Sequence, residues 1–190
     1  VLAQMAACHL RLGDLRTAKK MCRLALKLDP YHAEACYQLG ACLAAEKDYR
    51  QSVRWLQEAV QNDESREDAH RLLAAMYGQL GRPAKALRHW WRAVEIAPED
   101  PAAWLQLTEY LLAEGNYQEA CDVVGQALEN AGNTEMLYCA AACQFLCGNR
   151  RDAVDTLRKA LNADKNRRSD IYRWAPALRD DAEVQKLLCI

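Results

Sequence analysis

The sequence lacks the features of a membrane protein, a disordered chain or a nucleic-acid binder. No apolar run reaches the roughly 18 residues that a transmembrane helix needs, so we expect no membrane association. Only 8 Gly and 5 Pro occur in 190 residues, too few for a low-complexity chain. The 25 basic side chains are balanced by 26 acidic ones, whereas nucleic-acid binding normally needs a large basic excess. A single Phe beside abundant Ala and Leu favours helix over sheet.

The cysteines indicate the cellular compartment of the protein, and the first residue indicates whether the chain is a fragment. Nine Cys at irregular spacing, mostly at apolar helix positions, fit reduced thiols in a cytoplasmic protein better than a disulfide framework. No signal peptide is visible, and the chain opens at Val1 without an initiator Met, inside a helical pattern. We therefore expect a cytoplasmic protein and a fragment of a longer chain that extends upstream.

Small residues recur with a period of 34 residues, which is the mark of a repeat protein. One alanine series has this spacing, with its last member one residue early: Ala25, Ala59, Ala93, Ala127 and Ala160. A second series also holds small side chains: Ala18, Ser52, Ala86, Ala120 and Ala153. A third series predicts the turn between two helices in each unit: Gly13, Lys47, Gly81, Gly115 and Gly148. Because closely crossing helices leave room only for small side chains, each unit is predicted to be a pair of packed helices, such as 49–62 with its preceding partner.

Aromatic and small residues complete a motif within each period. In the fourth unit the motif comprises Trp104, Leu107, Tyr117, Ala120 and Ala127, and the third unit ends on Pro98. With these residues in register, the chain resembles the tetratricopeptide repeat family over about residues 1 to 167. The resemblance implies an all-α, right-handed helical-repeat solenoid of about five helix-turn-helix units plus a C-terminal capping helix.

The repeat boundaries follow from this register. A repeat array is expected over 1–168, with units of about 1–32, 33–66, 67–100, 101–133 and 134–167. The period is lost after that, and 169–190 is predicted to cap the apolar face of the last repeat, with Asp181 preceding a final helix and Ile190 as the natural C-terminus.

No catalytic cluster, cofactor motif or metal site is predicted. The sequence has no glycine-rich phosphate loop, serine elbow or paired-carboxylate motif. Among the histidines, His9 is expected in the core, whereas His32 and His70 near repeat junctions are expected to be partly exposed capping residues. Cys139, Cys143 and Cys147 share one helix face, which leaves a soft-metal site open as the alternative. Buried packing is favoured, because Cys143 falls in the apolar register of Cys42 and Met76.

The family resemblance implies that the first helices of successive units line a concave groove that binds peptides. Small residues floor the middle of this groove, aromatic and apolar residues supply contact, and Arg71 supplies a polar anchor. An acidic tail is disfavoured by the carboxylates at the rim, so an apolar or aromatic-bearing protein segment is the expected partner. The predicted rim carboxylates are Glu34, Asp68, Glu109 and Glu135. The predicted groove residues are Tyr37, Ala41, Arg71, Ala75, Leu105, Glu109, Leu112, Tyr138 and Phe145.

These features predict a non-catalytic protein-interaction scaffold that binds a peptide or partner helix in its groove. The alternative is a structural domain that self-associates or docks against a missing N-terminal region. Trp91 falls in an outward-facing register and is expected on the convex side, away from the groove.

Overall fold

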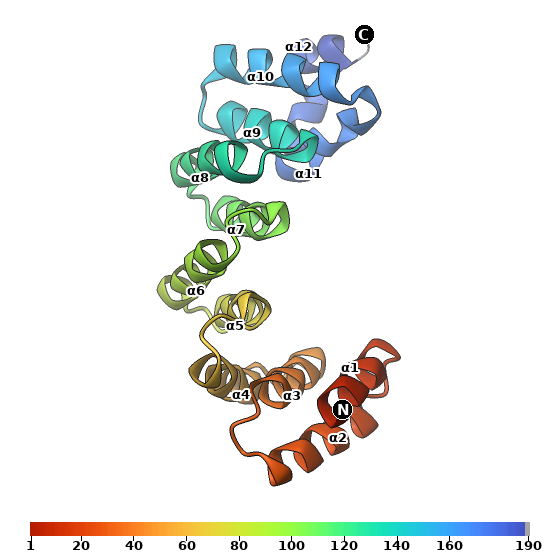
Figure 1. Cartoon of the computed structure of the whole chain (residues 1–190). Helices are drawn as coiled ribbons and strands as arrows, with labels where there is room; N and C mark the ends of the chain where they lie inside the picture. Colours follow the sequence, from red (N-terminus) through yellow and green to blue (C-terminus); the bar gives the residue numbers. More distant parts are fainter. Residues whose placement is uncertain (189–190) are drawn as a thin grey trace. The chain divides into compact units, whose positions relative to one another are not determined.

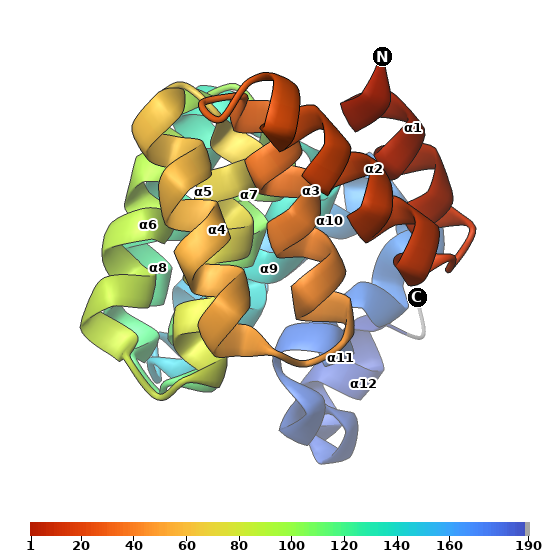
Figure 2. The same ribbon diagram turned by 90° about the horizontal axis from the view of Figure 1, so that it is seen from below.

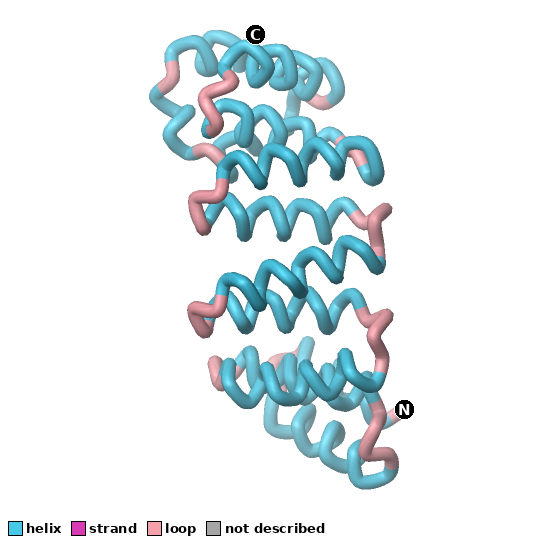
Figure 3. Tube along the Cα trace, turned by 90° about the vertical axis from the view of Figure 1, so that its left-hand side faces the viewer, coloured by secondary structure: helices cyan, strands magenta, loops and turns pink. Residues whose placement is uncertain are grey.

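The computed structural model describes residues 1–188, and almost all of them are helical (Figure 1). Over these residues there are twelve α-helices, two 3-10 helices and no strand, so the all-α prediction is confirmed. Successive helices are joined by short loops (Figure 3). Within the described residues, no helix is both long enough and apolar enough to cross a lipid bilayer.

The chain forms two compact units, of which the first comprises Val1–Ile96. Its helices pack as consecutive pairs, α1 with α2, α3 with α4 and α5 with α6 (Figure 2). The six helices are α1 (Leu2–Arg11), α2 (Leu15–Leu28), α3 (Ala33–Ala45), α4 (Tyr49–Asn62), α5 (Glu67–Gln79) and α6 (Pro83–Ile96).

The second unit begins at Ala97 and contains two further helix pairs followed by a tail. The pairs are α7 (Pro101–Ala113) with α8 (Tyr117–Ala131) and α9 (Thr134–Leu146) with α10 (Arg150–Ala163). The tail consists of the 3-10 helix η1 (Lys165–Asp170), α11 (Ile171–Trp174), the 3-10 helix η2 (Pro176–Asp180) and α12 (Ala182–Leu188).

The turn within each helix pair lies at the predicted position, which is held by Gly13, Lys47, Gly81, Gly115 or Gly148. Gly13 has φ 78° and Gly115 has φ 79°, values that glycine adopts without the strain of a Cβ atom. Lys47 takes the same turn with φ 63°, as the one positive-φ non-glycine residue among those described. The next helix then begins on a side-chain cap, as where the Asp48 carboxylate accepts a hydrogen bond from the Gln51 backbone N–H at 3.2 Å.

The small-residue series lie where paired helices cross. Ala59, Ala93 and Ala127 are completely buried, as are all members of the second series. Ser52 shows how tight the crossing is, because its hydroxyl donates a hydrogen bond to the Gly40 carbonyl at 2.8 Å. The repeat register read from the sequence is therefore the register of the core.

The tail is more elaborate than the single capping helix that the sequence suggested. Asp181 does cap α12, accepting hydrogen bonds from the backbone N–H groups of Glu183 and Val184. The preceding segment α11, however, lies against α9, the first helix of the last pair (Figure 1). Ile171, Trp174 and Leu178 are buried in this arrangement. The last two residues of the predicted cap, including Ile190, lie outside the described residues.

Candidate functional site

In the first unit, the predicted groove residues lie on one half-exposed stripe of each first helix. Tyr37 and Ala41 are one turn apart on α3, and Arg71 and Ala75 are one turn apart on α5. All four are half-exposed, whereas their helices bury the opposite side against α4 and α6. Since α3 also contacts α5, these residues belong to one continuous surface, which we call the first-unit surface.

Arg66 sits at the edge of the first-unit surface and connects its two helices. Its guanidinium lies over the Tyr37 ring, 4.8 Å from the centroid, and pairs with Glu34 at 2.5 Å and Asp68 at 2.8 Å. Burial opposes ionisation of Glu34, but hydrogen bonds from Gln38 and Arg66 outweigh it and lower the pKa of the Glu34 carboxyl. Two of the predicted rim carboxylates, Glu34 and Asp68, are thus paired with a cation that the sequence pattern did not indicate.

Arg71, the predicted polar anchor, also has a partner. Its Nη1 donates a hydrogen bond to Glu67 Oε1 at 3.0 Å, one turn earlier on α5. The two side chains are 24% and 20% exposed, so solvent screens the pair only in part. A ligand carboxylate or carbonyl would compete with Glu67 for the guanidinium rather than meet an isolated charge.

In the second unit, the predicted residues do not form an open surface. Tyr138 is completely buried, and its hydroxyl donates a hydrogen bond to the Asp164 carbonyl at 2.8 Å. Leu105 is 8% exposed, while Leu112 and Phe145 are half-exposed. Tyr138 is therefore a packing residue in this conformation, because the chain after α10 folds over it.

The tail segment that covers this surface is held by two carboxylates from different first helices. Arg173 pairs with Glu109 on α7 at 2.6 Å and with Glu135 on α9 at 2.9 Å. The Trp174 indole N–H donates a hydrogen bond to Glu109 at 3.2 Å, and the side chain is 6% exposed. Beside these contacts lies a cavity of about 340 Å³, lined by Glu109, Leu112, Ala113, Arg173 and Trp174.

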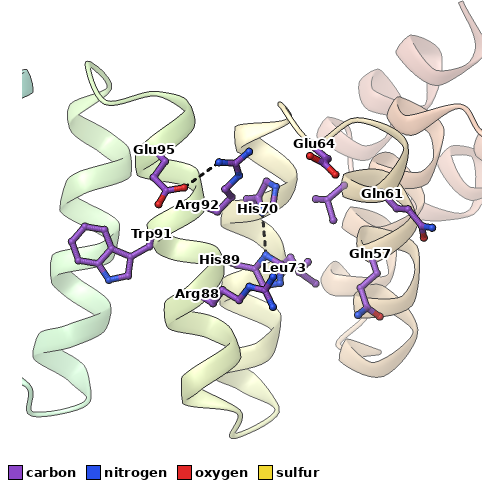
Figure 4. A pocket seen from close by; sticks show the side chains of 11 residues that line it. Gln57, Gln61, Glu64, His70, Leu73, Arg88, His89, Trp91, Arg92 and Glu95 are labelled. Carbon is purple, nitrogen blue, oxygen red and sulfur yellow. Dashed lines mark hydrogen bonds and ion pairs between the residues drawn. The ribbon is translucent and has the colours of Figure 1, made fainter.

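The first unit has a hollow of its own, which lies on the side of the second helices between α4, α5 and α6 (Figure 4). It has a volume of about 760 Å³, and Trp91 and Arg88 line it from α6. On its floor the Nδ1 atoms of His70 and His89 lie 3.0 Å apart, joined by a hydrogen bond. Burial lowers the pKa of both imidazoles, that of His89 to about 4, so both are neutral at physiological pH.

These positions correct the expectations for His70 and His9 and confirm that for His32. His70 is buried at 6% exposure, not a partly exposed capping residue, because α6 brings His89 over it. His32 does cap α3, with its Nδ1 accepting a hydrogen bond from the Ala35 backbone N–H at 3.3 Å. His9 is half-exposed and lies 3.5 Å from the Asp14 carboxylate, outside the core.

Cys139 and Cys143 are completely buried among the helices, as expected, whereas Cys8 is exposed. Cys147 departs from this pattern, since it is half-exposed at the end of α9 with its Sγ 3.0 Å from the Cys121 Sγ. Across residues 1–188, no group of three or more His, Cys, Asp or Glu side chains has an arrangement that could hold a metal ion.

Sequence profiles place the chain in a family. Two profiles described as "Tetratricopeptide repeat" match residues 3–76 and 67–109. Together they span residues 3–109, which is more than half of the 190 residues.

Individual relatives match only with parts of longer proteins. The chain is 30% identical over 128 residues to the TPR repeat-containing protein YpiA of Bacillus subtilis, covering 67% of this chain and 30% of that protein. It is 22% identical over 153 residues to anaphase-promoting complex subunit 3 of Schizosaccharomyces pombe, covering 80% of this chain and 23% of that protein. The chain thus spans less than a third of the length of these curated relatives.

Solved structures share the fold at low sequence identity. The crystal structure of YrrB, described as a TPR protein with an unusual peptide-binding site, matches with a TM-score of 0.68 and 24% identity, covering 90% of this chain and 89% of that one. A crystal structure of MamA matches with a TM-score of 0.72 and 18% identity, covering 87% and 91% of the two chains. These similarities establish the helical-repeat fold of the solenoid type.

Proposed function

Because the chain belongs to the tetratricopeptide repeat family, we propose that it is a non-catalytic, cytoplasmic protein-interaction scaffold that binds a peptide or partner helix on its first helices. The observation that carries this proposal is the first-unit surface, where Tyr37, Ala41, Arg71 and Ala75 are half-exposed on adjacent first helices. The description of YrrB as a TPR protein with a peptide-binding site supports the same use of this fold.

The chemistry of the first-unit surface indicates the kind of ligand. Ala41 and Ala75 are small enough for a peptide backbone to approach α3 and α5 closely, and the Tyr37 ring offers an apolar contact with a hydroxyl at its tip. Glu34 and Asp68 neutralise Arg66, and Glu67 neutralises Arg71, so the surface has no excess cation for an acidic ligand. A neutral or mildly basic segment with apolar or aromatic side chains therefore fits best, and nucleic acid does not.

The test is a selection of random peptides on the whole chain, followed by affinity measurements on variants. Tyr37→Ala and Arg71→Ala are each expected to weaken a selected peptide about tenfold, roughly 1.4 kcal/mol, as interface hot spots do. Trp91→Ala is the matched control, because Trp91 is a half-exposed aromatic residue on α6 that lines the hollow on the other side of the first unit. Circular dichroism would verify that each variant keeps its helices.

Two outcomes would contradict the proposal. Unchanged affinity for both Tyr37→Ala and Arg71→Ala would show that the first-unit surface is not the binding site. Loss of binding in Trp91→Ala, with the other two variants unaffected, would place the interaction on the second helices.

A structural, self-associating role is the second candidate, and one observation favours it. Large apolar side chains are exposed around α1 and α2: Leu12 at 80%, Leu28 at 80% and Tyr31 at 76%. Burying such side chains in a protein contact would remove their apolar surface from water, which is favourable. Light scattering after size exclusion would show a concentration-dependent dimer that Leu28→Asp disrupts, whereas a monomer at all concentrations would argue against this role.

A further inference from the structure

The tail of the second unit occupies the surface that corresponds, in the repeat register, to the first-unit surface. α11 lies on α9, and the residues before it cover Tyr138, the register partner of Tyr37. Tyr37 is half-exposed whereas Tyr138 is completely buried. The chain itself therefore shows what kind of segment this surface accepts.

Arg173 and Trp174 bind the tail to both first helices, Arg167 adds a second ion pair to Glu135 at 2.8 Å, and Ile171 is completely buried beneath them. The Arg173 guanidinium directs Nη1 to Glu135 at 2.9 Å and Nη2 to Glu109 at 2.6 Å, so one side chain bridges α7 and α9. Trp174 inserts beside it with 6% exposure and donates its indole N–H to the same Glu109 at 3.2 Å. The guanidinium also stacks on the indole, 5.2 Å from the ring centroid.

We propose that the α7–α9 surface is a recognition site for an arginine followed by an aromatic residue, and that the chain's own Arg173–Trp174 occupies it until a partner segment with the same pair displaces the tail. Glu109 and Glu135 recognise the guanidinium, whose planar fork can donate to both carboxylates at once. Leu112 and the adjoining cavity of about 340 Å³ receive the neighbouring apolar side chains of the ligand.

Displacement is feasible because the polar contacts of the tail are near the surface. The Arg173 side chain is 55% exposed, so water and salt screen both of its ion pairs. The tail competes through its buried side chains Ile171, Trp174 and Leu178 and through its high effective concentration as part of the same chain, so a displacing partner must supply apolar contacts of its own. This inference extends the proposed scaffold function to the second unit but uses residues separate from the first-unit surface.

The probe for this site is a fluorescent peptide with the sequence of residues 164–180, titrated into the whole chain and followed by fluorescence polarisation. Wild-type protein is expected to bind it weakly, because the site is filled. Arg173→Ala/Trp174→Ala, which weakens the resident tail, is expected to bind it at least tenfold more tightly. Arg179→Ala is the matched control, because this exposed arginine of the same tail stacks on Tyr172 and does not contact either carboxylate.

Two further variants test recognition itself. In the Arg173→Ala/Trp174→Ala background, Glu109→Gln/Glu135→Gln should reverse the gain, and a peptide in which both Arg173 and Trp174 are alanine should not bind. If loss of the buried Trp174 unfolds the unit by circular dichroism, Arg173→Ala alone keeps the indole in place and should still raise affinity about threefold.

The proposal would be overturned by a folded tail variant that binds the peptide no better than wild type, or by binding that ignores Glu109 and Glu135. In either case the tail is a structural cap only. Tyr37→Ala and Arg71→Ala should leave this titration unchanged, so the outcome is distinguishable from failure of the first-unit surface.

Discussion

A close contact between two helices of the first unit predicts an unusual result for a glycine-to-alanine change in a helix. Gly40 lies inside α3, and a Cβ built on its backbone would lie 2.7 Å from Leu56 Cγ and 2.9 Å from Leu56 Cδ2. Carbon atoms in favourable contact are about 3.5–4.0 Å apart, and Leu56 is completely buried, so its side chain has little room to move.

Two opposing effects set the magnitude of this change. Replacing glycine by alanine inside a helix contributes about 1 kcal/mol of stability. Overpacking a dense core costs about 1–3 kcal/mol. Gly40→Ala is therefore expected to lower the free energy of unfolding by up to about 2 kcal/mol, which urea denaturation followed by far-ultraviolet circular dichroism can measure.

Gly125 provides the matched control, because it lies inside α8 and a Cβ there would meet no atom within 4 Å. Gly125→Ala should raise stability by about 0.5–1 kcal/mol, the opposite sign. A double-mutant cycle with Leu56→Ala sharpens the test, since Gly40→Ala should become stabilising once the Leu56 side chain is gone. The reasoning is refuted if Gly40→Ala stabilises the wild-type chain as much as Gly125→Ala does.

Three further predictions concern pH, a helix cap and the thiols. Burial lowers the pKa of His89 to about 4, whereas an unfolded histidine titrates near 6.5, so the unfolded chain binds the proton first as the pH falls. The free energy of unfolding should therefore drop by about 1–3 kcal/mol from pH 6.5 to 4. His89→Asn should reduce this pH dependence, as measured by urea titrations at pH 7 and 4.5. Asp181→Ala removes the cap of α12 and an ion pair with Arg150, so the free energy of unfolding from urea denaturation should fall by about 1 kcal/mol. Asp180→Ala, at the exposed neighbour, should leave the free energy of unfolding unchanged. Cys8 is the exposed cysteine among those described, so mass spectrometry after brief alkylation should find it labelled well before the buried thiols, and equal labelling of all of them in the native protein would contradict the packing.

Local geometry explains why the repeat register could be read from the sequence. A turn with positive φ needs glycine or a residue that tolerates the left-handed region, and five such turns recur at the predicted positions. Lys47 was placed in this series by its register alone, and its φ of 63° agrees with that placement. The alanines follow the same logic, because a crossing helix leaves no room for a larger side chain at that point.

The candidate site was only partly predictable, because exposure depends on what packs over a residue. Tyr37 and Tyr138 occupy equivalent register positions and have the same side chain. One remains half-exposed under the Arg66 guanidinium, and the other is buried beneath the tail. No local pattern distinguishes them, since the difference arises from contacts 26 residues or more along the chain.

The sequence by itself determined the elements and their pairing: helices of 13–15 residues in the four complete repeats, the turns between them and the small residues at each crossing. These features depend on spacing within a few turns of helix, and such spacing is written directly in the order of residues. Only the tertiary structure decided which side chains meet across helices. Three contacts depend on how separate helices and the tail fold back: the His70–His89 hydrogen bond, the cation–π contact of Arg66 with Tyr37, and the ion pairs of Arg173 with Glu109 and Glu135. Such contacts form through space between residues that are far apart along the chain.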